Sequence, residues 1–193
     1  KICDQISNIR KTNAKKLEKQ ITSNLQSLEM KGSYFEILFE LTTPTNLGHD
    51  KVIFTLSSNK GQKNRPINEI ASGGELSRLT LAIYLSSEKL NQSFLVFDEI
   101  DAGIGGSTAF SIGAKLKDLA SKNQVLCITH LAQIAAYNNQ IVKVTKETNK
   151  KETITHIVNI NKKQDIIQEI SRMLGDFSQK GIELAQELVN KVK

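Results

Sequence analysis

Short apolar runs alternate with polar and glycine-containing segments along most of the chain, which is typical of a mixed α/β fold. The runs 94–97 and 124–128 are rich in β-forming residues. We expect both to be buried strands, the first of them buried on both faces. A helical pattern over about residues 107–120 lies between them. Strand, helix and strand at this spacing predict a βαβ unit, whose two strands are parallel and end at the same edge of the sheet.

The first 31 residues differ, because their apolar residues recur at spacings of three and four in a polar, Lys-rich segment. This narrow apolar stripe predicts one strand of a coiled coil whose partner lies elsewhere, and an ordinary amphipathic surface helix is the alternative. Gly32 is expected to end the helix. The other expected elements are antiparallel strands over 34–41 and 52–56, a turn region over 42–50, a loop over 59–66, a helix from 72 to about 90, a hairpin of 141–145 and 153–160, and helices over 165–174 and 179–192.

Carboxylates gather where the strand 94–97 ends. Asp98 and Glu99 follow it directly, Asp101 comes two residues later, and the glycine-rich turn 102–106 follows. Open α/β sheets place their chemistry at the carboxyl ends of strands, and this combination has the form of a Walker B motif. Asp98 would hold Mg²⁺, directly or through water, and Glu99 would polarise the water that attacks a γ-phosphate. A core strand that leaves into a solvated turn would give the same local sequence.

The segment Ser72-Gly73-Gly74-Glu75 predicts the start of a helix. Ser72 is a suitable N-cap, and Glu75 follows three residues later as in a capping box. A capping box does not need two glycines, which lower helix propensity and leave bare backbone N–H groups at the positive end of the helix dipole. The combination therefore favours close approach of a phosphate group over capping alone.

His130 is the third candidate for a functional group. It follows the second buried strand, so the βαβ arrangement is expected to place it beside Asp98 and Glu99. An imidazole at that edge could donate a hydrogen bond to a γ-phosphate oxygen or orient the attacking water. A purely structural histidine is the alternative.

Composition adds further constraints. The 193 residues suffice for one substantial core, and no apolar run is long enough to span a bilayer. Cys3 and Cys127 do not make a disulfide framework, and Cys127 is expected to be a reduced core thiol, which fits a cytoplasmic setting. The net charge of +6 permits a polyanionic partner such as DNA. Because the chain begins without a methionine or a signal-peptide pattern, we expect it to be part of a longer protein.

The three candidate sites together resemble those of ABC-type ATPases. Residues 72–75 are similar to the signature motif of these enzymes, 94–99 to their Walker B strand with its catalytic glutamate, Asp101 to the start of their D-loop and His130 to their switch histidine. The segments 71–78, 97–106, 127–135 and 171–175 are most similar to the RecN family of bacterial SMC-like DNA repair ATPases. The resemblance covers essentially the whole chain.

The resemblance implies an α/β fold, namely the C-terminal lobe of an SMC/RecN-like P-loop ATPase head. The lobe would have a parallel sheet core and occupy residues 32–193, and residues 1–31 would be the returning arm of a coiled coil. Heads of this kind dimerise with ATP sandwiched between them. The implied partners are DNA and a second copy of the protein, in the cytoplasm at the nucleoid, with no membrane.

The resemblance also implies a role for each candidate residue. Ser72, Gly73, Gly74 and Glu75 would bind the γ-phosphate of the ATP held by the opposite head, and Asp101 would link the two ATP sites. For the ATP of their own head, Asp98 would support Mg²⁺, Glu99 would be the general base and His130 would sense the γ-phosphate.

One motif of these ATPases is missing. The 193 residues contain no G-x-x-x-x-G-K-[ST] phosphate loop, which in the family lies in the N-terminal half of the head. We therefore expect the chain to need that half as a partner, and to neither bind nor hydrolyse ATP appreciably alone. Two alternatives stay open: another SMC-like or RecF-like ATPase head, or a non-catalytic DNA-binding or structural lobe whose contacts are the basic loop 60–65 and the Lys150-Lys151 hairpin.

Overall fold

The computed structural model describes residues 1–59, 61–87, 94–138, 140–149 and 152–192. The chain divides into two compact units. The first unit consists of residues 1–104 and 119–128, and the second consists of residues 105–118 and 129–193. None of the helices in the described part of the chain has the length and hydrophobicity of a transmembrane span.

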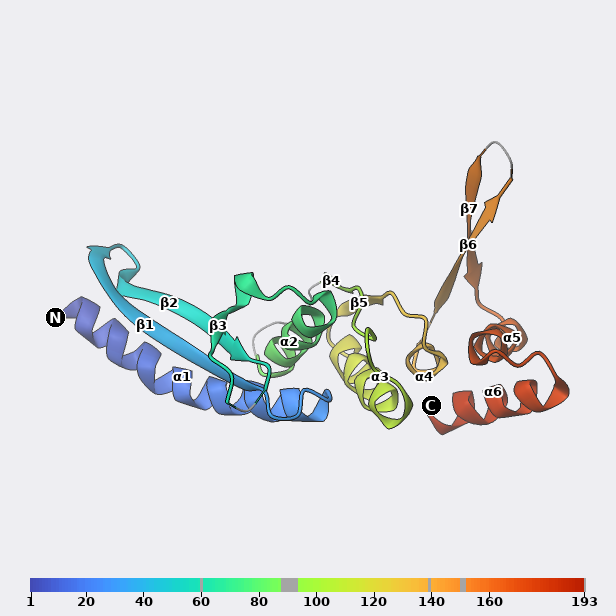
Figure 1. The fold of residues 1–193 in the computed structure, drawn as a ribbon, viewed down its shortest axis with the longest axis horizontal. Helices are drawn as coiled ribbons and strands as arrows, with labels where there is room; N and C mark the ends of the chain where they lie inside the picture. Colours follow the sequence, from blue (N-terminus) through green and yellow to red (C-terminus); the bar gives the residue numbers. More distant parts are fainter. Residues whose placement is uncertain (60, 88–93, 139, 150–151, 193) are drawn as a thin grey trace. The chain divides into compact units, whose positions relative to one another are not determined.

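In the first unit, helix α1 (Ile2–Ser27) lies along a hairpin of two long strands, β1 (Tyr34–Thr45) and β2 (Gly48–Ser57) (Figure 1). The apolar stripe of α1 faces its own chain from Ala14 onward, where Ala14, Ile21 and Leu25 are buried. Near the N-terminus, Ile2 and Ile9 are exposed at 72% and 64%. The helix ends at Ser27, earlier than the expected stop at Gly32. The assignment of residues 1–31 to a coiled-coil arm stays a prediction.

The antiparallel pairing of β1 and β2 is confirmed, but the strands are longer than predicted. Thr45 pairs with Gly48, so the chain reverses at residues 46–47 and the turn region predicted over 42–50 is wrong. The register shifts between Leu41 and Thr45, where Pro44 lacks the N–H that a regular ladder needs. A two-residue strand, β3 (Arg65–Pro66), pairs with β2 and leads into the 3₁₀ turn η1 (Ile67–Glu69), so the predicted loop 59–66 is partly a strand. Lys60, the first residue of the basic loop, lies outside the described residues.

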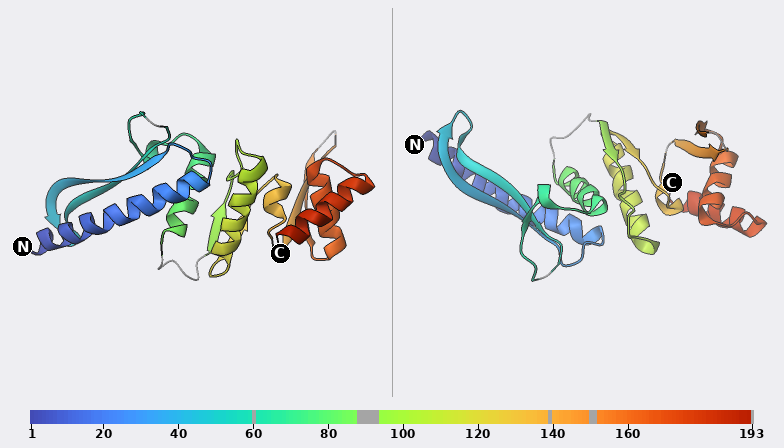
Figure 2. Two further views of the ribbon diagram at one scale, coloured as in Figure 1. Left: turned by 90° about the horizontal axis from the view of Figure 1, so that it is seen from below. Right: turned by 45° about the horizontal axis from the view of Figure 1, so that its top comes forward.

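Helix α2 (Gly73–Leu85) packs against α1 (Figure 2). It ends at Leu85 rather than near residue 90, because Ser86 and Ser87 have left the helix; residues 88–90 lie outside the described part of the chain. Strands β4 (Phe94–Phe97) and β5 (Gln124–Cys127) pair in parallel, with Phe97 opposite Cys127. Helix α3 (Gly106–Ala120) connects them along the chain. The predicted strand–helix–strand order and parallel pairing are confirmed.

The prediction that β4 is buried on both faces is wrong, and so is the prediction that β5 is a buried strand, since none of residues 124–127 is fully buried. Leu95 and Phe97 are buried, but Phe94 and Val96 are exposed at 61% and 53%. Phe97 packs edge-on against Tyr84 of α2, with ring centroids 6.4 Å apart. The elements of this unit therefore cover one face of the strand, and its apolar residues alternate between core and surface.

The second unit contains most of α3, the hairpin of β6 (Ile141–Thr148) and β7 (Thr153–Ile160), and the helices α5 (Lys163–Leu174) and α6 (Gln179–Lys191). These elements confirm the predicted hairpin and the two predicted C-terminal helices. A four-residue helix that was not predicted, α4 (Ala132–Ala135), packs against α5. Apolar residues of α4, α5 and α6 form the core of the unit. Lys150 and Lys151, at the hairpin turn, lie outside the described residues.

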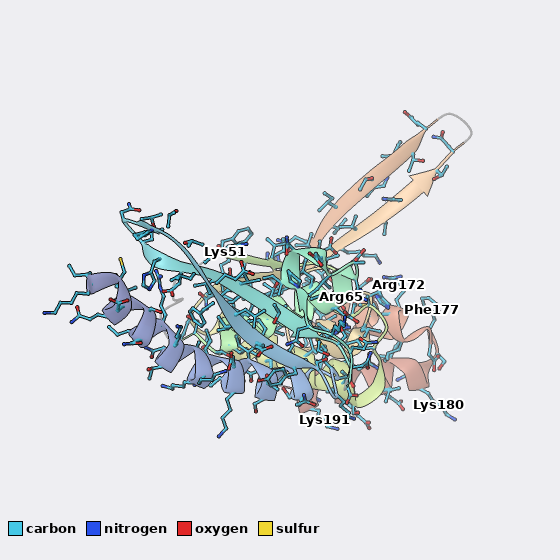
Figure 3. All side chains as sticks on the ribbon, turned by 60° about the vertical axis from the view of Figure 1, so that its left-hand side comes forward. Lys51, Arg65, Arg172, Phe177, Lys180 and Lys191 are labelled. Atoms are coloured by element: carbon cyan, nitrogen blue, oxygen red, sulfur yellow. The ribbon has the colours of Figure 1, made fainter. Side chains whose placement is uncertain are left out.

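A cavity of about 470 Å³ lies in the second unit among β6, α5 and the start of α6. Arg172 and Phe177, labelled in Figure 3, are among its lining residues. Glu169 is buried there and accepts hydrogen bonds from Arg172 at 2.9 Å and from Lys143 at 2.6 Å. Burial raises the pKa of Glu169, but these cationic donors outweigh that effect and hold the pKa below its ordinary value. The charges of Lys143 and Arg172 are balanced by those of Glu169 and Asp165, so the cavity offers a ligand no net charge.

Candidate functional site

The start of α2 is capped as predicted. Ser72 has an extended backbone, with φ −93° and ψ 117°, and its Oγ accepts a hydrogen bond from the Glu75 N–H at 3.4 Å. The Glu75 carboxylate accepts a second bond, at 2.9 Å, from the Oγ of Ser58, which directly follows β2. Glu75 therefore also ties the helix start to the hairpin, a contact that the sequence did not predict.

The two glycines after Ser72 have different neighbours. The space that a Gly73 side chain would fill is taken by Oε2 of Glu99, so a carboxylate oxygen already lies against the bare backbone of the helix start. A side chain on Gly74 would meet the Ala102 Cβ at 2.9 Å and the Glu99 carbonyl oxygen at 3.2 Å. Gly73 thus leaves room for an anionic oxygen, and Gly74 lets the helix pack against the turn that follows β4.

Asp98 and Glu99 lie at the carboxyl end of β4, and both are exposed. Glu99 has φ +55°, a left-handed conformation that costs an L-residue about 1–2 kcal/mol. Oδ1 of Asp98 accepts a hydrogen bond from the Glu99 N–H at 2.9 Å, and the Glu99 carbonyl accepts one from the Ala102 N–H at 3.0 Å. These hydrogen bonds hold the backbone of the turn, and Glu99 with it, in this strained conformation.

Asp101 differs from its neighbours because it is buried, at 4% exposure. The carboxylates of Asp101 and Asp98 both act on Cys127 at the end of β5. Burial first, and then these two negative charges, raise the pKa of the Cys127 thiol to about 12. The thiol is therefore protonated at neutral pH, and Cys127 is a free cysteine, as predicted, but it is half-buried rather than part of the core. The same interaction places the carboxyl ends of β4 and β5 close together within this unit.

Sequence reasoning missed two residues of α2 that bind the turn after β4. Ser77 Oγ donates a hydrogen bond of 2.6 Å to the Asp98 carbonyl oxygen. Arg78 Nη1 donates to the carbonyl oxygens of Ile100 and Ala102, at 3.3 and 2.9 Å. Burial lowers the pKa of the Arg78 guanidinium, which nevertheless stays protonated at neutral pH. The sequence did contain one indication of the role of Arg78. Arg78 lies four residues after Gly74 and four before the buried Ala82, so a helix places it on the face that packs inward.

The exposed carboxylates at this strand end are groups of the kind that Mg²⁺ takes as ligands. Among the described residues, no three His, Cys, Asp or Glu side chains form a cluster that could hold a metal ion. Mg²⁺ commonly needs one or two carboxylates and takes its other ligands from water and phosphate oxygens. The exposed Asp98 fits that role, and its Oδ1 is oriented by the Glu99 N–H.

His130 is exposed and belongs to the second compact unit, three residues after the end of β5. Its expected position beside Asp98 and Glu99 stays a prediction. The structure thus brings together Ser72, Gly73, Gly74, Glu75, Asp98, Glu99 and Asp101 within the first unit.

Comparison with curated proteins gives a consistent result. The chain is 38% identical over 175 residues to the DNA repair protein RecN of Vibrio cholerae, covering 89% of this chain and 31% of that protein. It is 37% identical over 186 residues to RecN of Bacillus subtilis, covering 88% and 32%. With RecN of Rickettsia prowazekii it is 36% identical over 198 residues, covering 100% and 35%. The chain spans about a third of the length of these relatives, and the resemblance to RecN is confirmed over nearly all of it. No protein-family model matches the chain.

Comparison with solved structures gives the fold. An Smc head domain with a coiled coil and joint from Pyrococcus yayanosii aligns with a TM-score of 0.56 and 18% identity, covering 85% of this chain and 30% of that one. An Smc head domain with an extended coiled coil from Pyrococcus furiosus aligns with a TM-score of 0.54 and 20% identity, covering 84% and 39%. The chain shares the fold of part of these Smc head domains, which confirms the predicted fold class.

Proposed function

We propose that this RecN-like chain is the C-terminal lobe of an ATPase head that acts in DNA double-strand break repair. It contributes the signature segment 72–75 and the catalytic strand end 98–101, and a partner polypeptide contributes the phosphate loop. ATP is hydrolysed between two such heads, and hydrolysis controls how long the heads stay together on DNA.

The observation that carries this proposal is the position of the Glu99 carboxylate. Its Oε2 lies where a Gly73 side chain would be, at the amino end of α2. A helix amino terminus with bare backbone favours an anionic oxygen there. A phosphate oxygen has the same charge and similar size, so the site that holds this carboxylate in the lobe alone would accept a γ-phosphate. When a phosphate binds at Gly73, the Glu99 side chain is displaced and becomes free to act on water.

Each residue of the strand end has a distinct task in the proposed reaction. Asp98, oriented by the Glu99 N–H, supports Mg²⁺, which neutralises charge on the phosphates when it is bound. Glu99 accepts a proton from the attacking water. The buried Asp101 joins the strand end to the neighbouring head, and His130 donates a hydrogen bond to the γ-phosphate. Ser72 and the Gly73 and Gly74 N–H groups bind the γ-phosphate of the opposite head's ATP.

The partners follow from the same arrangement. The chain has no phosphate loop, so ATP binding needs the N-terminal half of the head. DNA is the proposed macromolecular substrate, because the relatives are named DNA repair proteins and the net charge is +6. A cytoplasmic protein associated with the nucleoid is the corresponding setting.

The test is ATP turnover by the complete protein that contains this chain, with and without Glu99→Gln. Glu99→Gln keeps the size of the side chain but removes its basicity, so turnover should fall by roughly 100-fold or more while ATP still binds. An ATP-bound dimer should then accumulate in size-exclusion chromatography. Glu40→Gln is the matched control, because Glu40 lies on the exposed β1–β2 hairpin, pairs with Lys51 and has no role in the proposed site. A Glu99→Gln protein that turns over ATP at the parent rate would exclude Glu99 as the base.

A further inference from the structure

Two neighbouring residues of α2 bind three backbone carbonyl groups after β4, those of every second residue from 98 to 102. Ser77 binds the carbonyl of Asp98, and Arg78 binds those of Ile100 and Ala102. These carbonyls belong to the segment that carries the proposed base Glu99 and the buried Asp101. The first two turns of α2 and the strand end are thus connected by side chain to backbone hydrogen bonds in addition to packing.

Arg78 is an unusual residue for such a position. Its side chain is 9% exposed, and its Nε is a buried nitrogen that finds no hydrogen-bond partner among the described residues. A buried guanidinium is costly, and here its donors are used on backbone carbonyls. Nη1 of Arg78 also lies 3.3 Å from the Cβ position of Gly74, so the guanidinium, the glycine and the turn form one packed cluster. An apolar side chain would fill this space without the free-energy cost of burying a charge, so packing alone does not explain why residue 78 is an arginine.

We infer that Arg78, assisted by Ser77, is a positioning residue that fixes the turn 98–102 to the start of α2. The consequence of this inference rests on the proposed function. If the start of α2 binds the nucleotide of one site, then the general base Glu99 and Asp101, which belong to the neighbouring site, would move together with it. The hydrogen bonds of Arg78 go to backbone carbonyls of the turn, so its inferred role is to position the turn and not to bind a nucleotide. It acts through the carbonyls on either side of Asp101 and keeps Glu99 at its positive φ.

The test uses Arg78→Lys in the complete protein. Lysine keeps the charge but lacks the planar fork of donors that reaches two carbonyls at once. A small misplacement of a catalytic group is sufficient to slow turnover strongly, so we expect kcat to fall roughly 10- to 100-fold with KM for ATP unchanged. Hydrogen exchange of the Ala102 and Ile104 amides, which bond to the Glu99 and Asp101 carbonyls, should accelerate about tenfold.

Matched controls come from the same unit. Arg10→Lys changes another arginine that binds a loop carbonyl, that of Leu47, at the far end of the β1–β2 hairpin, and should alter neither quantity. Ser77→Ala should also accelerate exchange in the turn. Thr80→Ala should not, because the Thr80 hydroxyl bonds to Leu76 of its own helix at 2.8 Å.

Two results would overturn the inference. In the first, Arg78→Lys keeps the parent kcat and the parent exchange rates in the turn. In the second, exchange accelerates equally throughout α2, β1 and β2, which means that Arg78 only stabilises the unit. If the parent protein proves to have no ATPase activity, the proposed function fails, whereas selective acceleration at Ala102 and Ile104 would still support the positioning role.

Discussion

Gly74→Ala tests the packing of α2 against the turn after β4. The added methyl group would lie 2.9 Å from the Cβ of Ala102 and 3.2 Å from the Glu99 carbonyl oxygen. Neither atom is the end of a flexible side chain, so the turn and the helix must move apart. Gly73→Ala is the informative comparison with Gly74→Ala, because its added methyl group meets only the carboxylate of Glu99, and that side chain can rotate away.

The magnitude follows from two opposing effects. Overpacking of this kind typically costs about 1–3 kcal/mol. Replacing glycine by alanine in a helix returns about 0.5–1 kcal/mol, because alanine restricts the unfolded chain and favours the helix. For Gly74→Ala we expect a net loss of about 1–2 kcal/mol. Gly73→Ala should be close to neutral in stability, although it displaces the Glu99 carboxylate.

The assay is urea unfolding of this chain followed by circular dichroism, with melting temperatures as a second readout. The predicted loss corresponds to a decrease in Tm of roughly 2–8 °C for a chain of this size. Gly105→Ala is the control, since no atom lies within 4 Å of the added methyl group and it should be neutral or slightly stabilising. If Gly74→Ala were as stable as Gly105→Ala, helix α2 would not be packed against the turn as described.

Three further predictions concern single side chains. Glu99→Gly should raise the free energy of unfolding by up to about 1 kcal/mol. Glycine relieves the strain of φ +55°, and the larger backbone entropy of glycine in the unfolded chain cancels only part of this gain. A decrease of more than about 1 kcal/mol in the free energy of unfolding, measured with urea, would contradict the strained turn. Burial would raise the pKa of Asp50, but hydrogen bonds from Ser7 and Arg10 outweigh this effect and lower the pKa. The ionised Asp50 therefore stabilises the folded chain above the ordinary carboxyl pKa of about 4. This stabilisation is lost as the pH falls through the lower pKa of the folded state. The parent Tm should therefore fall more steeply below pH 4 than that of Asp50→Asn, and identical profiles would exclude the Asp50 contribution. Because the pKa of Cys127 is about 12, this thiol in a Cys3→Ser variant should react with iodoacetamide at pH 8 roughly 100- to 1,000-fold more slowly than a free thiol. A rate equal to that of free cysteine would show that burial and the nearby carboxylates do not raise the pKa of Cys127.

The elements that local periodicity specifies were predictable. The strands at 94–97 and 124–127, the helix between them and the parallel pairing all follow from apolar runs at βαβ spacing. The turn over 42–50 was wrongly predicted because its polar residues are held as strands by contacts far along the sequence. Arg10 of α1 binds Asp50 and the Leu47 carbonyl, which no local pattern reveals.

The local structure of the candidate site was predictable, but its contacts were not. Ser72 with Glu75 three residues later predicted a capped helix start, and Ser72 caps α2. The binding of a phosphate at this helix start stays a prediction. The approach of Glu99 to Gly73 and the binding of the turn by Arg78 depend on how two separate elements pack. The exposure of Phe94 and Val96 has the same origin, since a strand sequence does not show which of its faces a neighbouring element covers.

The most direct test of the account is ATP hydrolysis by this chain alone and after addition of the N-terminal half of the head that carries the phosphate loop. The account predicts no appreciable activity from the chain alone, activity on mixing, and loss of that activity when the chain carries Glu99→Gln. Activity from the chain alone that Glu99→Gln abolishes would contradict the composite site. Absence of activity on mixing, with the two halves shown to associate and DNA present, would contradict the proposal that this lobe completes an ATPase.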